Sequence, residues 1–293
     1  MGECILRVFI KRPVTFFIIF GLLFSSISFF LQPLSPFSSI AHRGASVYAP
    51  ENTMASFHKA IELGFDFIEF DVRISKDGEL VVIHDPKVNR TTNGDGFVHD
   101  LSSNELKKLD AGSWFHSSFS GERIPLLSEV LEEFGGKVGL LIDVKQSEVN
   151  KFLNEKLAQL LQTYFDNGLN PSTIKVQSFQ VNQVKHFSTL CPDVSVGIVV
   201  NKTLNMFQLA SYRNFASFIS IHHQLITEAF IKQAKYFDYE VYSWTIKEQF
   251  QFIAMQRLSV NGIISNLEQK DTLSNRYITA LFEKGQKFLR IFV

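Results

Sequence analysis

The chain has 293 residues, enough for one large α/β domain or two ordinary domains. Hydrophobic residues make up 45% of it and charged residues 20%, which fits a globular protein with a substantial core. Lysine plus arginine and aspartate plus glutamate both number 29, so the formal net charge is zero and no nucleic-acid partner is expected. The two cysteines, Cys4 and Cys191, exclude a disulfide scaffold.

Residues 14–31 form an uncharged and mostly apolar stretch, VTFFIIFGLLFSSISFFL. As a helix it would be about 27 Å long, close to the ~30 Å of a bilayer's hydrocarbon core. Three basic residues precede it within residues 1–13, and no lysine or arginine follows before Arg43. We therefore expect a transmembrane anchor, with residues 1–13 in the cytoplasm and the remaining chain on the non-cytoplasmic side of the membrane.

The alternative for this segment is a signal peptide, whose cleavage would release a secreted or periplasmic protein. No Ala-x-Ala cleavage site follows residues 14–31, and the stretch is long for the apolar part of a signal peptide. We favour the uncleaved anchor for these two reasons.

From about residue 39 onward, short apolar runs alternate with windows of helical periodicity, which indicates a parallel sheet covered by helices. About eight such units in roughly 250 residues predict a TIM (β/α)₈ barrel over residues 39–270. A doubly wound open sheet is the alternative, although no G-x-G-x-x-G motif opens the first unit. The strand-like runs lie near Ile40 and at residues 67–72, 80–83, 139–144, 173–176, 194–200, 218–221, 240–243 and 262–264.

Two stretches depart from this alternation. Residues 86–136 are long and rich in turn residues, and we expect them to form a small insertion after the second barrel strand. Residues 271–293 are predicted to form a C-terminal helix packed on the barrel. Because its last part is amphipathic and basic, contact with a membrane is the alternative for that helix.

The first strand-like run ends at His42 and Arg43, followed by Gly44. A guanidinium offers paired donors to a phosphate, and an imidazole can move a proton near neutral pH. A histidine that only caps a strand end is the simpler interpretation of this motif taken alone.

The following strand ends add carboxylates and a second histidine. Glu69 and Asp71 are two residues apart on one strand, so their side chains point to the same face. Like charges on a buried face need either a metal ion or a basic partner, and both alternatives stay open for this pair. His84 ends the next run, and Asp143 and Lys145 share one face of the strand after it.

Three carboxylates without a cysteine favour one hard divalent cation, Mg²⁺ or Ca²⁺, over structural zinc. Asp85, which stands before Pro86, is predicted to form a turn rather than bind a ligand. His222 and His223 are adjacent on a strand and point in opposite directions, so we expect them to be structural.

Several of these residues belong to longer motifs. The motifs are His42-Arg43-Gly44, Pro50-Glu51-Asn52-Thr53, Gly64-x-Asp66-x-x-Glu69-x-Asp71, Lys76-Asp77-Gly78, Val81-x-x-His84-Asp85, Gln177-Ser178-Phe179 and Tyr242-x-Trp244-Thr245. In this order and spacing they closely resemble the signature of the glycerophosphodiester phosphodiesterase family. The resemblance spans about residues 39–270 and is most specific in the first fifty of them.

The resemblance implies a TIM barrel that cleaves glycerophosphodiesters into glycerol 3-phosphate and an alcohol. Carried over by position, Glu69, Asp71 and Asp143 would bind the metal, and His42 and His84 would be the acid–base pair. It also implies that Arg43 and Lys145 contact the phosphate while Gln177 and Trp244 line the substrate pocket.

Asp143 departs from the family pattern, because many members have glutamate at that position. An aspartate there resembles membrane-anchored relatives that act as lysophospholipase D. Together with residues 14–31, this departure keeps open a membrane-anchored enzyme that acts on lysophospholipids. A separate alternative is an inactive, membrane-tethered binding module that retained the barrel, although the presence of both histidines and all three carboxylates argues against it.

Overall fold

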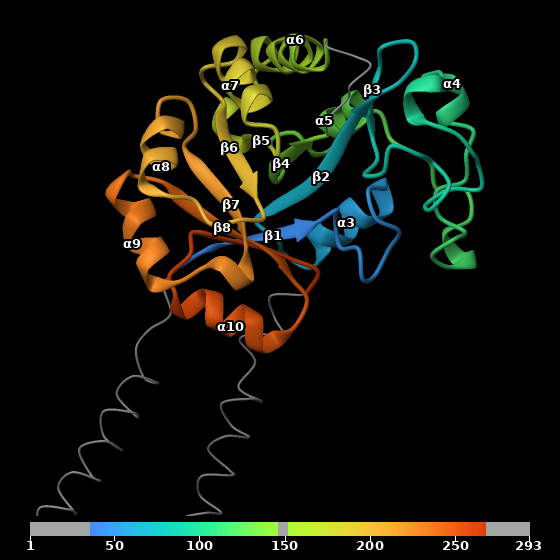
Figure 1. The fold of residues 1–293 in the computed structure, drawn as a ribbon. Helices are drawn as coiled ribbons and strands as arrows, with labels where there is room; N and C mark the ends of the chain where they lie inside the picture. Colours follow the sequence, from blue (N-terminus) through green and yellow to red (C-terminus); the bar gives the residue numbers. More distant parts are fainter. Residues whose placement is uncertain (1–35, 146–151, 268–293) are drawn as a thin grey trace, which may run out of the picture. The chain divides into compact units, whose positions relative to one another are not determined.

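The computed structural model describes residues 36–145 and 152–267, and within them eight parallel strands close into a barrel (Figure 1). Each strand pairs with the next around the ring, and β9 pairs with β1 to complete it. The predicted TIM-like α/β barrel is thereby confirmed. Its strands are β1 (Ser38–His42), β2 (Phe67–Ile74), β4 (Gly139–Val144), β5 (Ile174–Ser178), β6 (Ser195–Val200), β7 (Phe218–His222), β8 (Glu240–Ile246) and β9 (Gly262–Ser265).

Helices cover the outside of the barrel because their apolar faces pack against the strands. These outer helices are α3 (Met54–Glu62), α5 (Leu127–Phe134), α6 (Leu153–Asp166), α7 (Val181–Leu190), α8 (Met206–Tyr212), α9 (Glu228–Tyr236) and α10 (Gln249–Arg257). The residue before α3, Thr53, caps the helix, because its side chain accepts a hydrogen bond from the backbone N–H of Ser56. The rings of Phe57 and Phe134 then join α3 to α5 by an edge-on contact.

The inside of the barrel is filled by a separate layer of side chains, among them Leu141, Phe218 and Tyr242. The rings of Phe218 and Tyr242 stack at 4.8 Å between centroids. Gly197 makes room for this layer, since a Cβ atom at that position would overlap the Phe218 ring. The filled interior leaves space for a pocket only at an open end of the barrel.

The run at residues 80–83 is not a barrel strand. It forms β3 (Leu80–Val82), which pairs antiparallel with β2 in the register Val72 to Val82. The eight residues of β2 extend past the ring, and a tight turn at residues 75–79 sends the chain back along it (Figure 1). His84 therefore reaches the carboxyl edge of the barrel on a returning hairpin, whereas the sequence rhythm had suggested another parallel strand.

Within the expected insertion at residues 86–136, two parts differ in their packing. Residues up to 126 form a lobe with η1 (Val98–Asp100), α4 (Ser103–Leu106) and η2 (Ser117–Phe119), which has a small apolar core of its own. Residues 127–134 form α5, which belongs to the main core. The satellite lobe is therefore narrower than the expected insertion.

Among the helices that the structure describes, none is long and apolar enough to cross a membrane. The expected anchor at residues 14–31 and the expected C-terminal helix at residues 271–293 both lie outside the described ranges.

Candidate active site

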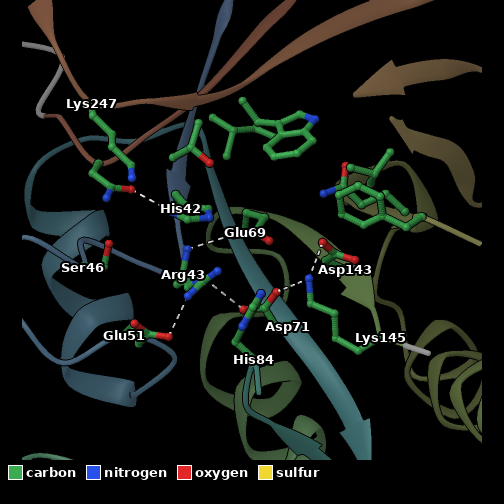
Figure 2. Close-up of a pocket in the computed structure, with 17 residues that line it drawn as sticks. His42, Arg43, Ser46, Glu51, Glu69, Asp71, His84, Asp143, Lys145 and Lys247 are labelled. Carbon is green, nitrogen blue, oxygen red and sulfur yellow. Dashed lines mark hydrogen bonds and ion pairs between the residues drawn. The ribbon is translucent and has the colours of Figure 1, made fainter. Parts of the chain in front are cut away.

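A pocket of about 420 Å³ lies at the carboxyl ends of the barrel strands (Figure 2). All nine predicted site residues line it: His42, Arg43, Glu69, Asp71, His84, Asp143, Lys145, Gln177 and Trp244. They come from strands β1, β2, β4, β5 and β8 and from the end of the β2–β3 hairpin. Residues that are 202 positions apart in the sequence thus meet because every parallel strand ends at the same edge.

Three buried carboxylates form the floor of the pocket. Asp71 on β2 lies opposite Asp143 on β4, and Glu69 shares the face of Asp71. One oxygen atom from each lies within 4.8 Å of the others. Burial and the charges of the two aspartates raise the pKa of Glu69 well above its usual range. Burial also raises the pKa of Asp143, so removal from water makes negative charge costly here.

Two cations offset part of this negative charge. Lys145 Nζ lies 2.8 Å from Asp71 and 2.8 Å from Asp143, and Arg43 Nε lies 3.4 Å from Asp71. Burial alone would raise the pKa of Asp71, but the charges of Lys145 and Arg43 outweigh it and lower that pKa. Arg43 also pairs with Glu51 at 2.8 Å. Both basic side chains are therefore held by carboxylates, as Figure 2 shows.

The carboxylate floor fits a divalent cation. Asp143 Oδ1 is buried and accepts no hydrogen bond within the described ranges, which leaves a desolvated oxygen without a partner. Three clustered oxygens and no sulfur form a donor set typical of Mg²⁺ or Ca²⁺. Glu69, Asp71 and Asp143 are thus the residues that could hold one.

Asn52 and Arg43 fix the carboxylates from the β1–α3 loop. Asn52 donates to Asp71 Oδ2 at 2.8 Å and accepts from the Asp71 backbone N–H at 3.2 Å. The Arg43 backbone N–H donates to Glu69 at 2.8 Å. Both loop residues have φ of 58°, a left-handed conformation that asparagine tolerates well but that costs an arginine about 1–2 kcal/mol. The loop adopts this left-handed backbone conformation at the two residues that orient the carboxylates of the pocket floor.

Each histidine of the pocket has a different partner. His42 Nδ1 lies 2.8 Å from Asn266 Oδ1, so Nδ1 donates and Nε2 is left as a proton acceptor. Burial and the charge of Arg43 lower the pKa of His42 to about 4, and the ring is neutral at neutral pH. His84 Nδ1 instead faces Asp85 Oδ1 at 2.6 Å. A carboxylate can balance the charge of a protonated imidazole, whereas an amide cannot.

Asp85 is therefore more than a turn-forming residue. Arg90 from the satellite lobe donates to Asp85 Oδ2 at 2.6 Å, and this hydrogen bond is the main reason that the pKa of Asp85 falls to about 2. The same guanidinium donates to Glu51 at 2.7 and 2.8 Å. The lobe thus secures the histidine's carboxylate partner from outside the barrel.

The other side of the pocket carries few charges. Gln177 on β5 accepts a hydrogen bond from the Ser220 hydroxyl at 2.6 Å. The rings of Trp244 and Phe179 meet edge-on at 5.5 Å, and Phe179 is 41% exposed. His222 contacts Trp244 outside the pocket lining, and its ring stacks on that of His223 at 4.6 Å between centroids. The two side chains therefore do not point in opposite directions as expected, because β7 ends at His222 and His223 begins η4 (His223–Leu225).

The sequence interpretation missed three supporting residues of the site. Asn52 had a signal, because it stands in the Pro50–Thr53 motif, but its partner on β2 is 19 residues away. Asp85 belonged to the Val81-x-x-His84-Asp85 motif, but the proline after it favoured a turn-forming role. Asn266 lies 224 residues from His42, and no local pattern reveals such a contact.

Comparison of the sequence and fold with known proteins identifies the family to which the chain belongs. The model of the glycerophosphoryl diester phosphodiesterase family matches residues 42–267. The chain belongs to the glycerophosphoryl diester phosphodiesterase family. It is accordingly an enzyme of the phosphoric diester hydrolase class. The matched range begins at His42 and ends just after Asn266, so it includes every strand end that contributes to the pocket.

Relatives extend over most of the chain. The chain is 40% identical over 230 residues to YhdW of Bacillus subtilis (strain 168), provisionally named as a glycerophosphodiester phosphodiesterase; the match covers 78% of this chain and 93% of the relative. It is 37% identical over 240 residues to the glycerophosphodiester phosphodiesterase of Caldanaerobacter subterraneus, with 80% and 96% covered. An Oleispira antarctica phosphodiesterase solved with the product sn-glycerol-3-phosphate is 30% identical, with a TM-score of 0.71 and 80% and 95% covered.

Proposed function

We propose that this enzyme hydrolyses glycerophosphodiesters to glycerol 3-phosphate and an alcohol, with a bound Mg²⁺ or Ca²⁺ ion. The observation that carries the proposal is the convergence of three buried carboxylates and two differently partnered histidines on one pocket. The product bound to the Oleispira phosphodiesterase supports the same substrate class.

Glu69, Asp71 and Asp143 would hold the cation, because their oxygens cluster and Asp143 Oδ1 lacks another partner. When bound, a divalent cation supplies Lewis-acid polarisation of the phosphoryl group. Arg43 and Lys145 border the same floor, where pre-placed cations stabilise the charge on the non-bridging oxygens by about 3–4 kcal/mol each. Their pairing with the carboxylates keeps both basic side chains in place before substrate binds.

The two histidines would move the protons. His42 is neutral and offers Nε2, so it suits the base that removes a proton from the glycerol hydroxyl next to the phosphate. That hydroxyl oxygen attacks phosphorus, the bond to the alcohol breaks, and His84 gives the departing oxygen its proton. Asp85 balances the charge of His84 before this transfer.

The resulting cyclic phosphate would then be opened by water with the roles reversed. His84 takes a proton from the water whose oxygen attacks phosphorus, and His42 returns its proton to the glycerol oxygen that leaves. Both histidines regain their starting states, and the product is glycerol 3-phosphate.

The test is an assay of the full-length protein in detergent on glycerophosphocholine, with Mg²⁺, with Ca²⁺ and with a chelator. We expect release of glycerol 3-phosphate that the chelator abolishes and one of the two ions restores. Activity that persists after complete metal removal would refute the metal-dependent proposal, and the absence of any product would favour the inactive binding module.

A lysophospholipase D activity is the second candidate. The partly exposed Phe179 and the Trp244 ring form an apolar wall at the pocket mouth, which could accept part of an acyl chain. Lysophosphatidylcholine in the same assay separates the two activities, because its cleavage would yield lysophosphatidic acid in place of glycerol 3-phosphate.

A further inference from the structure

Lys247 is a pocket residue to which neither the family resemblance nor the proposed proton transfers give a role. It follows the last residue of β8, Ile246, and lines the same pocket as the carboxylate floor. Figure 2 places it on the side of His42, away from Asp143 and Lys145. Its side chain is exposed to solvent while it lines the pocket, so it can meet an entering ligand.

The charge of Lys247 differs from the other positive charges of the pocket in one respect. Arg43 and Lys145 are both ion-paired with carboxylates. Within residues 36–145 and 152–267, by contrast, no carboxylate lies within ion-pair distance of the Lys247 ammonium group. The neighbouring Glu248 is the N-cap of α10, and its backbone N–H donates to the side chain of Gln251 at 3.3 Å. The field of Lys247 is therefore available to a ligand.

The size of the pocket determines how far this field reaches. A sphere of 420 Å³ is about 9 Å across, which is close to the Debye length of about 8–10 Å at physiological ionic strength. A charged group anywhere in the pocket is therefore only partly screened from Lys247. In the proposed reaction the glycerol arm lies beside His42 and the head group beside His84, and the head group on the far side of the pocket is still within this range.

The formal charge of the pocket lining also bears on which ligands the pocket accepts. It has four carboxylates (Glu51, Glu69, Asp71 and Asp143) and three permanent cations (Arg43, Lys145 and Lys247). With one divalent cation and one phosphodiester monoanion bound, this lining is formally neutral. A head group with a fixed positive charge would add a charge that nothing in the lining compensates.

We propose that Lys247 makes this enzyme discriminate between substrates by head-group charge, favouring glycerophosphodiesters whose alcohol carries no fixed positive charge over those that end in choline. This inference rests on the proposed function, because it concerns the same pocket and the same reaction. Glycerol and inositol head groups belong to the favoured class, and choline belongs to the disfavoured one.

The test compares kcat/KM of the full-length enzyme on glycerophosphoglycerol and glycerophosphocholine, for the unchanged protein, Lys247→Gln and Lys247→Glu. The measured quantity is the ratio of kcat/KM for glycerophosphoglycerol to kcat/KM for glycerophosphocholine. We expect Lys247→Gln to lower this ratio about two- to sixfold, because the positive charge is removed, and Lys247→Glu to lower it further, because the charge is reversed. In the unchanged enzyme, added NaCl should also reduce the preference, whereas Lys247→Gln should respond less.

Lys235→Glu is the matched control, since it makes the same change of charge in the last turn of α9, at the barrel end opposite the pocket. It should leave the ratio unchanged. A ratio that is equal in the unchanged protein and both Lys247 variants would overturn the inference while leaving the proposed function intact.

A binding measurement distinguishes failure of the Lys247 inference from failure of the proposed function. Calorimetric titration of both diesters in chelator, where turnover is expected to stop, should show weaker binding of glycerophosphocholine and a smaller difference in Lys247→Gln. If no diester is hydrolysed under any condition, the proposed function fails, and the binding preference still tests Lys247. Equal binding of the two diesters by all variants would overturn the inference.

Discussion

The two sides of the pocket differ in composition. The side built by β1, the β2–β3 hairpin and β4 carries all the ionisable groups of the lining except Lys247. The side built by β5 and β8 offers an amide on Gln177, the indole of Trp244 and the ring of Phe179. Buried charges need opposite charges close by, and here they pair with one another across neighbouring strands.

This difference indicates that the two sides of the pocket contribute different functions. Proton transfer and metal binding require ionisable groups, and apart from Lys247 all those of the lining lie on the first side. The neutral side can contribute shape and hydrogen bonding, but it cannot exchange protons near neutral pH. Substitutions on the first side should therefore lower kcat, and those on the second should mainly raise KM.

The largest effect is expected for His42→Ala on the charged side. Loss of the base should reduce kcat by about 10²- to 10⁴-fold, because a positioned acid or base contributes that much. Steady-state kinetics give the value, and thermal unfolding followed by circular dichroism shows whether the fold is kept. His186→Ala on the outer helix α7 is the control. A folded His42→Ala enzyme with full activity would contradict the assigned role, and with it the division between the two sides.

A smaller effect on the same side is expected for Asp85→Asn. The asparagine keeps the size of the side chain but removes the negative charge beside His84 and the ion pair with Arg90. We expect kcat to fall about 10- to 100-fold, as is common when the carboxylate that orients a functional histidine is lost, with KM nearly unchanged. Comparison with Asp85→Glu tests whether charge is what matters. Equal loss in both variants would assign Asp85 a purely steric role.

The smallest effect on kcat is expected for Trp244→Leu on the neutral side. Loss of the aromatic wall should cost roughly 1–2 kcal/mol of substrate binding, or about 5- to 30-fold in KM, with less than a tenfold change in kcat. Trp244→Phe should restore most of the loss. Phe250→Leu, an exposed aromatic residue outside the pocket lining, should change neither constant. A collapse of kcat in Trp244→Leu would remove the distinction between the two sides.

Much of the charged side could be predicted from the sequence because its residues follow apolar strands. Alternation along β2 places Glu69 and Asp71 on one face, and the rule that parallel strands end together brings Asp143 to them. The same reasoning yields the barrel, since the strand–helix rhythm persists through most of the chain. Local patterns were sufficient wherever the secondary structure itself positions the side chain.

Other features depend on contacts that no local pattern encodes. The antiparallel direction of β3 is an exception, because Asp77-Gly78 is a common hairpin turn pair and was a local signal that the interpretation did not use. Whether Asp85 faces His84 depends on how two adjacent side chains rotate, and Asn266 meets His42 only through barrel closure. Lys247 follows an apolar strand like the others, but only the structure reveals that it has no ion-pair partner among the described residues.

The returning hairpin has a consequence for how this enzyme can change over evolution. His84 and Asp85 follow β3, whose Val81 and neighbouring Ile83 pack in the satellite core rather than in the main core. Leu80 and Val82 of the same strand pack in the main core, so substitutions confined to the lobe can shift one catalytic group slightly while the main core keeps its packing. The turnover rate can therefore change during evolution with little change in the thermal stability of the barrel.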